Sequence, residues 1–305
     1  MKKILIISAV AIIVLLLIGI LLFFFIGDDN VVECFGQEIE FSQTTDVNFT
    51  SNTNLEYSVD KLSSQLSKNT TYSVLYNPIL TDYKIVSQFG FDIDNYSLWD
   101  DGRRSYSADG PDKEKKLTID KYGCFSYTTG VGSATFEMPI DDNECYNIAK
   151  KYLQEQGLYS KRLGKDVSYN KTELYSLSEG TKVTAVGVNF LVDNTYGNAR
   201  IMVEINGNGE VISVTNSVRE YSDSKKVKLI SVKEAIERFK EGNAFIEVEN
   251  PSSNLKFEKV SVKYWSQERN DDNLFVQPVY YFEGTSTTTD GKTEPFSIAV
   301  QANRY

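Results

Sequence analysis

The sequence contains no histidine, and cysteine and proline are scarce, with 3 and 6 copies among 305 residues. Without histidine the chain cannot build a Ser-His-Asp triad, a Cys-His pair, a His-ligated zinc site or a histidine pH switch. Asp and Glu outnumber Lys and Arg by 42 to 32, which gives a formal charge of −10. So acidic a chain offers no phosphate-binding face, and we expect no nucleic acid among its partners.

Motifs that carry chemistry are missing as well. The sequence has no glycine-rich phosphate loop and no CxxC pair. Adjacent carboxylates occur at 100–101, 141–142 and 271–272, but a glycosidase needs two carboxylates on opposite sides of a bond. The loop that begins at Asp92 lacks the EF-hand residues at its fifth, sixth and twelfth places. We therefore predict a protein that is not an enzyme, with no catalytic residue, no metal site and no cofactor.

A long apolar run opens the chain. Residues Ile4 to Ile26 carry no charge, and as a helix they would be ~34 Å long, enough to span a hydrocarbon core of ~30 Å. Lys2 and Lys3 precede the run, which favours a cytoplasmic N-terminus. We predict a single-pass transmembrane helix, a signal-anchor within residues 1–29, and an acidic extracytoplasmic part outside the cell membrane. A cleaved signal peptide is the alternative, disfavoured by the run's length and by the lack of a small-x-small site.

The next two segments differ in pattern. Residues 30–54 are largely polar and show no hydrophobic period, which predicts a stalk. Residues 55–139 contain β-like runs such as 72–76, and residues 116–129 have the pattern of a hairpin. We predict a β-rich region there.

Two amphipathic helices are predicted further along the chain. Asp141 is followed three residues later by Glu144, and Ser231 is followed by Glu234 in the same way. This spacing is typical of a helix N-terminus, where the first side chain caps the backbone. Apolar residues then recur at helical spacing after each start.

Strand-like runs follow each of the two predicted helices. The order of helix and strands therefore occurs twice, about ninety residues apart. We predict two helix-on-antiparallel-sheet units, over residues 140–221 and 222–305, and an α+β fold for the chain.

One hairpin sequence resembles a known module. Residues 201–212 read IMVEINGNGEVI, which is similar to the sheet hairpin of PepSY domains, and residues 229–235 and 276–282 resemble the same module. A single-pass anchor followed by tandem PepSY-like units is the layout of membrane regulators of WalK-type sensor histidine kinases in Gram-positive bacteria. The resemblance covers roughly residues 140–305. It implies a non-enzymatic, regulatory role and brings no catalytic residues.

The three cysteines follow the predicted anchor. Cys124 and Cys145 are the pair that could form a disulfide, which would leave Cys34 over in the stalk. The alternative is three unpaired thiols, which we prefer slightly. Cys145 falls on an apolar helix face, where a cysteine packs as a small hydrophobic residue.

Aromatic residues are numerous, with 19 Tyr and 17 Phe. Most would fill half-buried strand positions. Tyr264, Trp265, Tyr280 and Tyr281 are the densest candidates for an exposed ligand or partner face, because alternation along a strand turns one residue of each neighbouring pair outward.

The sequence thus favours a regulatory or scaffold protein that acts by protein–protein interaction. Its expected partners are the membrane, through its own anchor helix, and another membrane protein such as a sensor kinase. The alternative is a binding module for cell-wall glycan or peptide that uses the aromatic sheet face. Partner identity and oligomeric state are left open.

Overall fold

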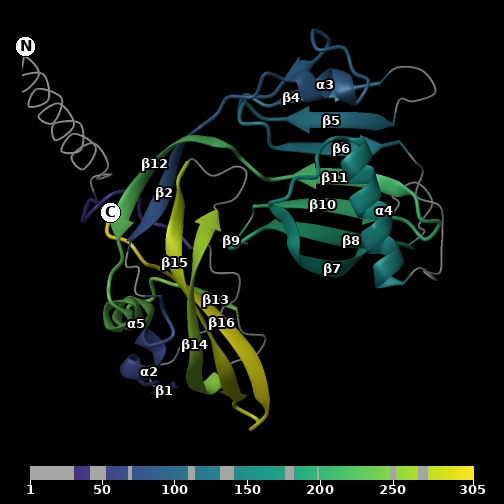
Figure 1. Ribbon diagram of the computed structural model, residues 1–305. Coiled ribbons are helices and arrows are strands. Elements are labelled where there is room, and N and C mark those ends of the chain that lie inside the picture. Colours follow the sequence, from purple (N-terminus) through teal and green to yellow (C-terminus); the bar gives the residue numbers. More distant parts are fainter. Residues whose placement is uncertain are drawn as a thin grey trace, which may run out of the picture. The chain divides into compact units, whose positions relative to one another are not determined.

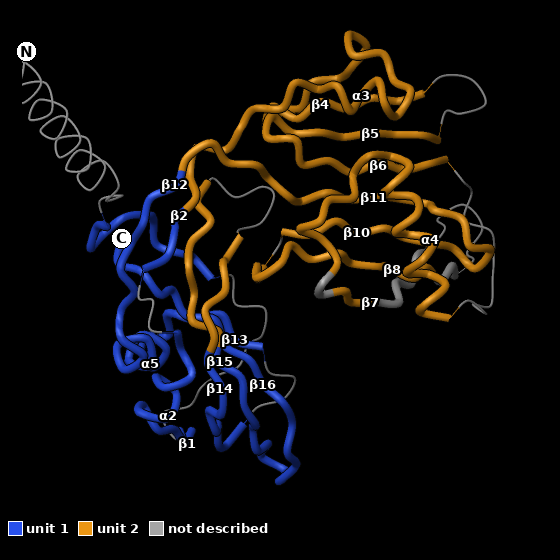
Figure 2. The backbone as a smooth tube through the Cα atoms, in the orientation of Figure 1, with its two compact units in different colours: residues 1–74, 224–260, 282–305 blue, residues 75–223, 261–281 orange. Residues whose placement is uncertain are grey.

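The structure is a computed structural model that describes residues 31–41, 53–67, 71–108, 114–130, 141–175, 182–197, 199–247, 252–266 and 274–305. The chain divides into two compact units (Figure 2). Unit 1 consists of Met1–Val74, Ser224–Val260 and Phe282–Tyr305, and unit 2 consists of Leu75–Asp223 and Ser261–Tyr281.

Unit 2 contains an eight-stranded antiparallel sheet. Its strands in spatial order are β3 (Ser97–Leu98), β4 (Arg104–Ser107), β5 (Lys115–Ile119), β6 (Phe125–Thr129), β11 (Val211–Asn216), β10 (Arg200–Ile205), β8 (Lys182–Val192) and β7 (Leu163–Tyr175). In the central strands β10 and β11, buried and less buried residues alternate along each strand. Ile201, Val203 and Ile205 of β10 are buried, and Val203 lies opposite the buried Val214 of β11. These side chains form one face of the core.

Helix α4 (Asp142–Glu155) lies across that face and contacts β8, β10 and β11 (Figure 1). Cys145, Ala149 and Leu153 recur every four residues and are all fully buried. The shorter α3 (Lys84–Gln88) is followed by Phe89, whose ring stacks on that of Tyr127 in β6 at 4.1 Å. The predicted amphipathic helix, its Asp141 cap and the buried position of Cys145 are confirmed.

The β10–β11 hairpin also forms as predicted. The turn between the strands is held by Asn206, whose side-chain oxygen accepts hydrogen bonds from the backbone N–H groups of Asn208 and Glu210, both at 3.0 Å. Gly209 has a φ of 78°, a conformation that glycine adopts readily. The Asn-Gly sequence therefore fixes the register of the pair.

A second eight-stranded sheet has the order β1-β14-β15-β16-β13, with β2, β9 and β12 paired outside this order. Its strands are β1 (Asn54–Glu56), β2 (Thr71–Pro78), β9 (Thr195–Gly197), β12 (Tyr221–Lys228), β13 (Phe245–Glu247), β14 (Ser252–Ser266), β15 (Val276–Thr288) and β16 (Thr293–Gln301).

Unit 1 has an aromatic core at Phe257. Its ring makes edge contacts with Phe239, Phe282 and Phe296, with centroids 5.7, 5.5 and 5.4 Å apart. Phe239 belongs to α5 (Val232–Lys240), which contacts β16 and the short α2 (Val59–Ser63). The predicted second helix and its Ser231 cap are thus confirmed.

The predicted α+β fold class is wrong. The described residues form a β-rich protein with two sheets and four helices, α2 to α5, of which only α4 and α5 exceed 5 residues. The two predicted helix-on-sheet units do not fit, because β6 pairs with β11 at Thr128 and Ser213. Strands β3–β6 thereby join the same sheet as β7, β8, β10 and β11. Pairing between strands that lie far apart in the chain produces no periodic pattern of residues, so it could not be predicted from the sequence.

The predicted membrane span, Ile4–Ile26, lies outside the described residues. Among the helices that are described, none has the length and apolar character required to cross a bilayer. The predicted single-pass, signal-anchor helix is therefore not among the helices that the structure describes.

Candidate binding pocket

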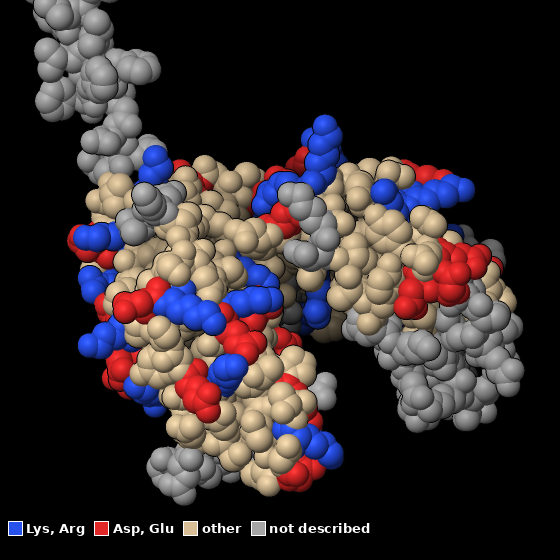
Figure 3. All heavy atoms as spheres, turned by 60° about the horizontal axis from the view of Figure 1, so that its bottom comes forward, with Lys and Arg blue, Asp and Glu red and all other residues tan. Residues whose placement is uncertain are grey.

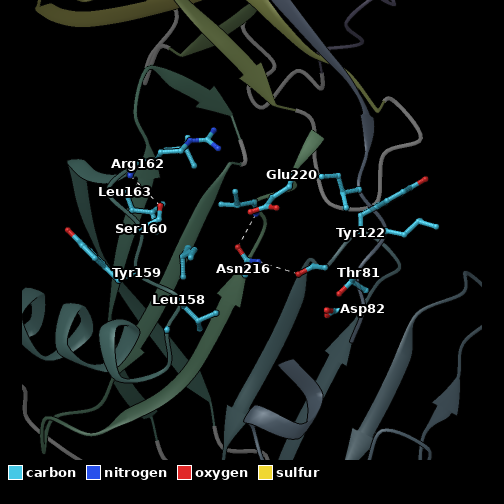
Figure 4. A pocket seen from close by; sticks show the side chains of 17 residues that line it. Thr81, Asp82, Tyr122, Leu158, Tyr159, Ser160, Arg162, Leu163, Asn216 and Glu220 are labelled. Carbon is cyan, nitrogen blue, oxygen red and sulfur yellow. Dashed lines mark hydrogen bonds between the residues drawn. The ribbon is translucent and has the colours of Figure 1, made fainter. Parts of the chain in front are cut away.

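A cavity of about 570 Å³ opens within unit 2 (Figure 4). Five segments surround it: the loop 79–82, the β5–β6 turn, residues 157–163 after α4, the ends of β8, β10 and β11, and residues 218–220 after β11. The side chains and glycines that line it are Ile79, Leu80, Thr81, Asp82, Tyr122, Gly123, Gly157, Leu158, Tyr159, Ser160, Arg162, Leu163, Val192, Ile201, Asn216, Val218 and Glu220. The lining is thus mixed: seven residues are aliphatic, eight carry polar or charged side-chain atoms, and two are glycines.

The loop 79–82 presents two aliphatic side chains to solvent. Leu80 is 67% exposed and Ile79 is 46% exposed. The backbone of the loop is tied down, since Ile79 N–H donates to the carbonyl of Glu220 at 2.8 Å and Thr81 N–H donates to that of Lys121 at 2.9 Å. Two large apolar side chains are therefore exposed to solvent at the edge of the cavity, where their burial by a ligand would be favourable.

The loop after α4 forms a second wall. Gly157 has a φ of 62°, which ends the helix, and the N–H groups of Leu158 and Tyr159 both donate to the carbonyl of Leu153, at 2.8 and 3.1 Å. The backbone N–H of Arg162 donates to Ser160 Oγ at 3.3 Å. The helix end therefore positions the aliphatic Leu158 and the charged Arg162 at the cavity.

Asn216 links two walls of the cavity. Its Nδ2 donates to the carbonyl of Gly123 at 3.3 Å, and its Oδ1 accepts the backbone N–H of Val218 at 3.0 Å, as the dashed lines in Figure 4 show. The amide thereby joins the end of β11 to the β5–β6 turn. Both its amide donor and its amide acceptor are engaged in hydrogen bonds within the protein, so we assign Asn216 a positioning role.

The charged groups of the lining have opposite signs. Arg162 and Glu220 both contribute to it, and Asp82 pairs with Lys84 at 2.6 Å. Hydrogen bonds from Lys84 lower the pKa of the Asp82 carboxyl, although both side chains are exposed. The cavity thus contains one cation and one anion besides this ion pair, and suits a ligand with both polar and apolar parts.

A second cavity of about 560 Å³ in unit 2 shares lining residues with the first. The shared residues are Ile79, Arg162, Val192, Val218 and Glu220. The two cavities therefore adjoin and together form a site longer than either one.

The four aromatic residues predicted as a ligand face do not form one exposed surface. Trp265 and Tyr280 are buried, with 5% and 3% exposure. Tyr264 is half-buried and lines the second cavity, and Tyr281 is half-buried beneath Lys263, whose Nζ lies 3.7 Å from the ring centroid. Strand alternation places the members of each neighbouring pair on different faces.

The disulfide considered possible between Cys124 and Cys145 is not formed, in line with the slightly preferred alternative of three thiols. Both side chains are buried, whereas Cys34 is exposed. Burial, the largest cause, and nearby carboxylates together raise the pKa of the Cys145 thiol, so it stays protonated and packs as a small apolar group.

Within the described ranges, no cluster of three or more Cys, Asp and Glu side chains could hold a metal ion. On the face shown in Figure 3, basic and acidic side chains lie next to one another over much of the surface. Pairs such as Lys228 with Glu33, at 3.2 Å, are of this kind.

Sequence patterns did not identify the cavity. Its lining comes from loops and strand ends far apart in the sequence, and only the tertiary fold joins them. One local signal existed: Ile79 and Leu80 are adjacent aliphatic residues between Pro78 and Thr81, in a segment with no helical or strand period.

Comparisons with known proteins identify no family. No family model matches the sequence, and no curated protein matches it. Among solved structures, an uncharacterized protein from Eubacterium rectale is 8% identical, with a TM-score of 0.45, and the match covers 78% of this chain and 86% of that one. The Bacillus megaterium YpeB C-terminal domain is 13% identical, with a TM-score of 0.29, over 72% of this chain and 98% of that one.

Both TM-scores are too low for an argument about a shared fold, so the PepSY resemblance of the hairpin sequence stays a prediction. At such low similarity neither match supports an argument about function, and the resemblance to regulators of WalK-type kinases is not confirmed.

Proposed function

We propose that this chain is a non-catalytic binding protein that acts by protein–protein interaction, with a segment of the partner seated in the unit 2 cavity. The supporting observation is the exposed Ile79-Leu80 pair at a cavity of about 570 Å³ with a mixed aliphatic and polar lining. Exposed aliphatic side chains beside a concave surface with a few placed polar groups are typical of interaction sites. The regulatory or scaffold role, the location outside the cell and a sensor kinase as partner stay predictions.

The lining favours a protein segment over a polyanion. Arg162 and Glu220 place opposite charges beside aliphatic Leu158, Val192 and Val218. A peptide offers apolar side chains together with polar backbone groups, so it complements both kinds of surface. The adjoining second cavity lengthens the site, which suits an extended segment.

The proposal is tested by photo-crosslinking from the pocket. A photoreactive amino acid replaces Leu80 in the full-length chain, produced in its own cells. The expected product is one dominant protein adduct, and Ser160→Trp, which adds an indole to the exposed loop that lines the cavity, should abolish it. The matched control carries the photoreactive group at Val31, which is also exposed but belongs to unit 1.

Two results would overturn the proposal. The same adduct from Leu80 and from Val31, or an adduct unaffected by Ser160→Trp, would show that the cavity does not select the partner. Adducts with cell-wall fragments alone would instead support the alternative, a wall-binding module. That alternative is the weaker one, because Tyr264 and Tyr281, the two members that are not buried, are only partly exposed, and Lys263 lies over the ring of Tyr281.

A further inference from the structure

Two consecutive arginines at the start of β4 in unit 2, Arg103 just before the strand and Arg104 as its first residue, lie on aromatic rings. The Cζ atom of Arg103 is 4.7 Å from the ring centroid of Trp99. The Cζ atom of Arg104 is 3.9 Å from the centroid of Tyr83 and 4.5 Å from that of Tyr96. Both guanidinium groups are therefore held by cation–π contacts, and Arg104 has two of them.

The two arginines differ in their counterions. Arg103 donates from Nε to Asp101 Oδ2 at 2.7 Å, and its Nη2 lies 2.6 Å from the same oxygen. Arg104 forms no ion pair with any residue that the structure describes. An arginine fork is built to receive a planar anion through parallel N–H groups. Arg103 already has such an anion in Asp101, and Arg104 is oriented by rings without one.

Tyr83 adopts an unusual backbone conformation beside Arg104. Its φ is 58° and its ψ is 11°, the left-handed region that a bulky side chain normally avoids. Its N–H donates to Thr81 Oγ1 at 3.2 Å, which helps to hold this geometry. The backbone is therefore strained at Tyr83, the residue whose ring lies closest to Arg104. Backbone strain of this kind is concentrated at functional sites.

An apolar side chain adjoins the cation. Arg104 lies opposite Leu98 in the β3–β4 pair, so the two side chains share one face of the sheet. Leu98 is 67% exposed, and Tyr96 is exposed as well. Tyrosine and arginine are both enriched in protein interaction hot spots, and Leu98 adds exposed apolar surface beside them.

We propose that Arg104, clamped by Tyr83 and Tyr96, binds a carboxylate on an acidic segment of a partner protein, with Leu98 contacting an apolar neighbour of that carboxylate. A singly charged carboxylate fits better than a phosphate, because Asp92 and Asp94 precede β3, Asp100 lies in the β3–β4 loop, and the chain's net charge is −10. These groups repel a dianion more strongly than a monoanion. This surface is distinct from the cavity of the proposed function, since none of these residues lines it.

The probe is a fluorescein-labelled, capped peptide of alternating Leu and Glu, tested by anisotropy on the full-length protein. Two comparison peptides are tested in the same way: in one, Gln replaces each Glu, and in the other, phosphoserine replaces each Glu. We expect the Glu peptide to bind about tenfold more tightly than the Gln peptide. Arg104→Lys keeps the charge but removes the planar fork, and should abolish this preference.

Matched variants separate this site from its neighbours. Arg103→Lys alters the adjacent stacked arginine and should leave the preference unchanged, and so should Ser160→Trp in the cavity. Leu98→Asp changes an exposed side chain, so it cannot damage the core, and should weaken binding of the Glu peptide. Equal binding of the Glu and Gln peptides, an intact preference in Arg104→Lys, or tighter binding of the phosphoserine peptide would overturn the proposal. Loss of binding in Ser160→Trp would also overturn it, and would direct attention to the cavity instead.

Discussion

Asp141 caps α4 through Glu144: its Oδ1 accepts the backbone N–H of Glu144 at 2.9 Å. The contact satisfies one of the donors that a helix leaves unpaired at its start. Asp141→Ala should therefore lower the free energy of unfolding by ~1 kcal/mol, measured by urea denaturation. The matched control is Asp142→Ala, which removes a neighbouring exposed carboxylate without removing the cap. Equal losses in the two variants would show that the first-turn charge, and not the hydrogen bond, matters.

Phe239 should contribute strongly to the stability of unit 1. It is buried on α5 and lies edge-on to Phe257. Phe239→Ala removes a large core side chain and should lower the free energy of unfolding by ~3–5 kcal/mol. Tyr169→Ala, at an exposed position, is the control and should change it little. A shift in Phe239→Ala of less than a third of that range would contradict the burial seen here.

The helices were predictable from sequence because their signals are local. A capping residue and a stripe of apolar residues lie within fifteen residues or so, and both Asp141 and Ser231 cap as predicted. The Asn206 turn was predictable for the same reason. The fold class was not, because the pairing of Thr128 with Ser213 joins segments that no local pattern relates.

Exposure on strands was harder to predict than strand position. The sequence indicated aromatic residues at 264–265 and 280–281, and these do lie on β14 and β15. Alternation alone does not say which face of a strand meets another layer, and the structure buries Trp265 and Tyr280. The cavity depends on loops, where neither period nor propensity applies.

Gly284 marks a close approach of two strands in unit 1. A Cβ atom at this position would overlap the carbonyl oxygen of Lys256 in β14. Gly284→Ala should therefore force the backbones apart and destabilise the protein by more than the ~1 kcal/mol typical of a strained glycine position. Gly291→Ala is the control, because a Cβ there meets open space although φ is 84°. Thermal melting of the two variants should show the larger decrease for Gly284→Ala.

The thiols should differ in reactivity. Cys34 is exposed, whereas Cys124 and Cys145 are buried and not joined to each other. Ellman's reagent should therefore react quickly with one thiol of the native, unreduced protein and with all 3 after unfolding. A single reactive thiol in unfolded, unreduced protein would reveal the disulfide that the structure lacks.

Tyr152 should make stability depend on alkaline pH. Burial is the main reason that its pKa rises from 10.0 to about 12 in the folded chain. The unfolded chain releases this phenol proton first, so the contribution of Tyr152 is complete below pH ~10 and is lost as the pH rises towards ~12. Between about pH 9 and about pH 11 the loss is on the order of 1 kcal/mol, because the folded pKa is not yet reached. Urea denaturation at about pH 9 and about pH 11 measures it.

The comparison with Tyr152→Phe isolates this residue from the other buried tyrosines. Phenylalanine fills the same space and has no proton to lose, so the variant should lose less stability between the two pH values than the natural sequence. Tyr57→Phe, which removes an exposed phenol, should lose as much as the natural sequence. If Tyr152→Phe and the natural sequence fell in parallel, the folded chain would release the Tyr152 proton as readily as the unfolded one, and the packing of this residue against the α4 core would have to be looser than the structure shows.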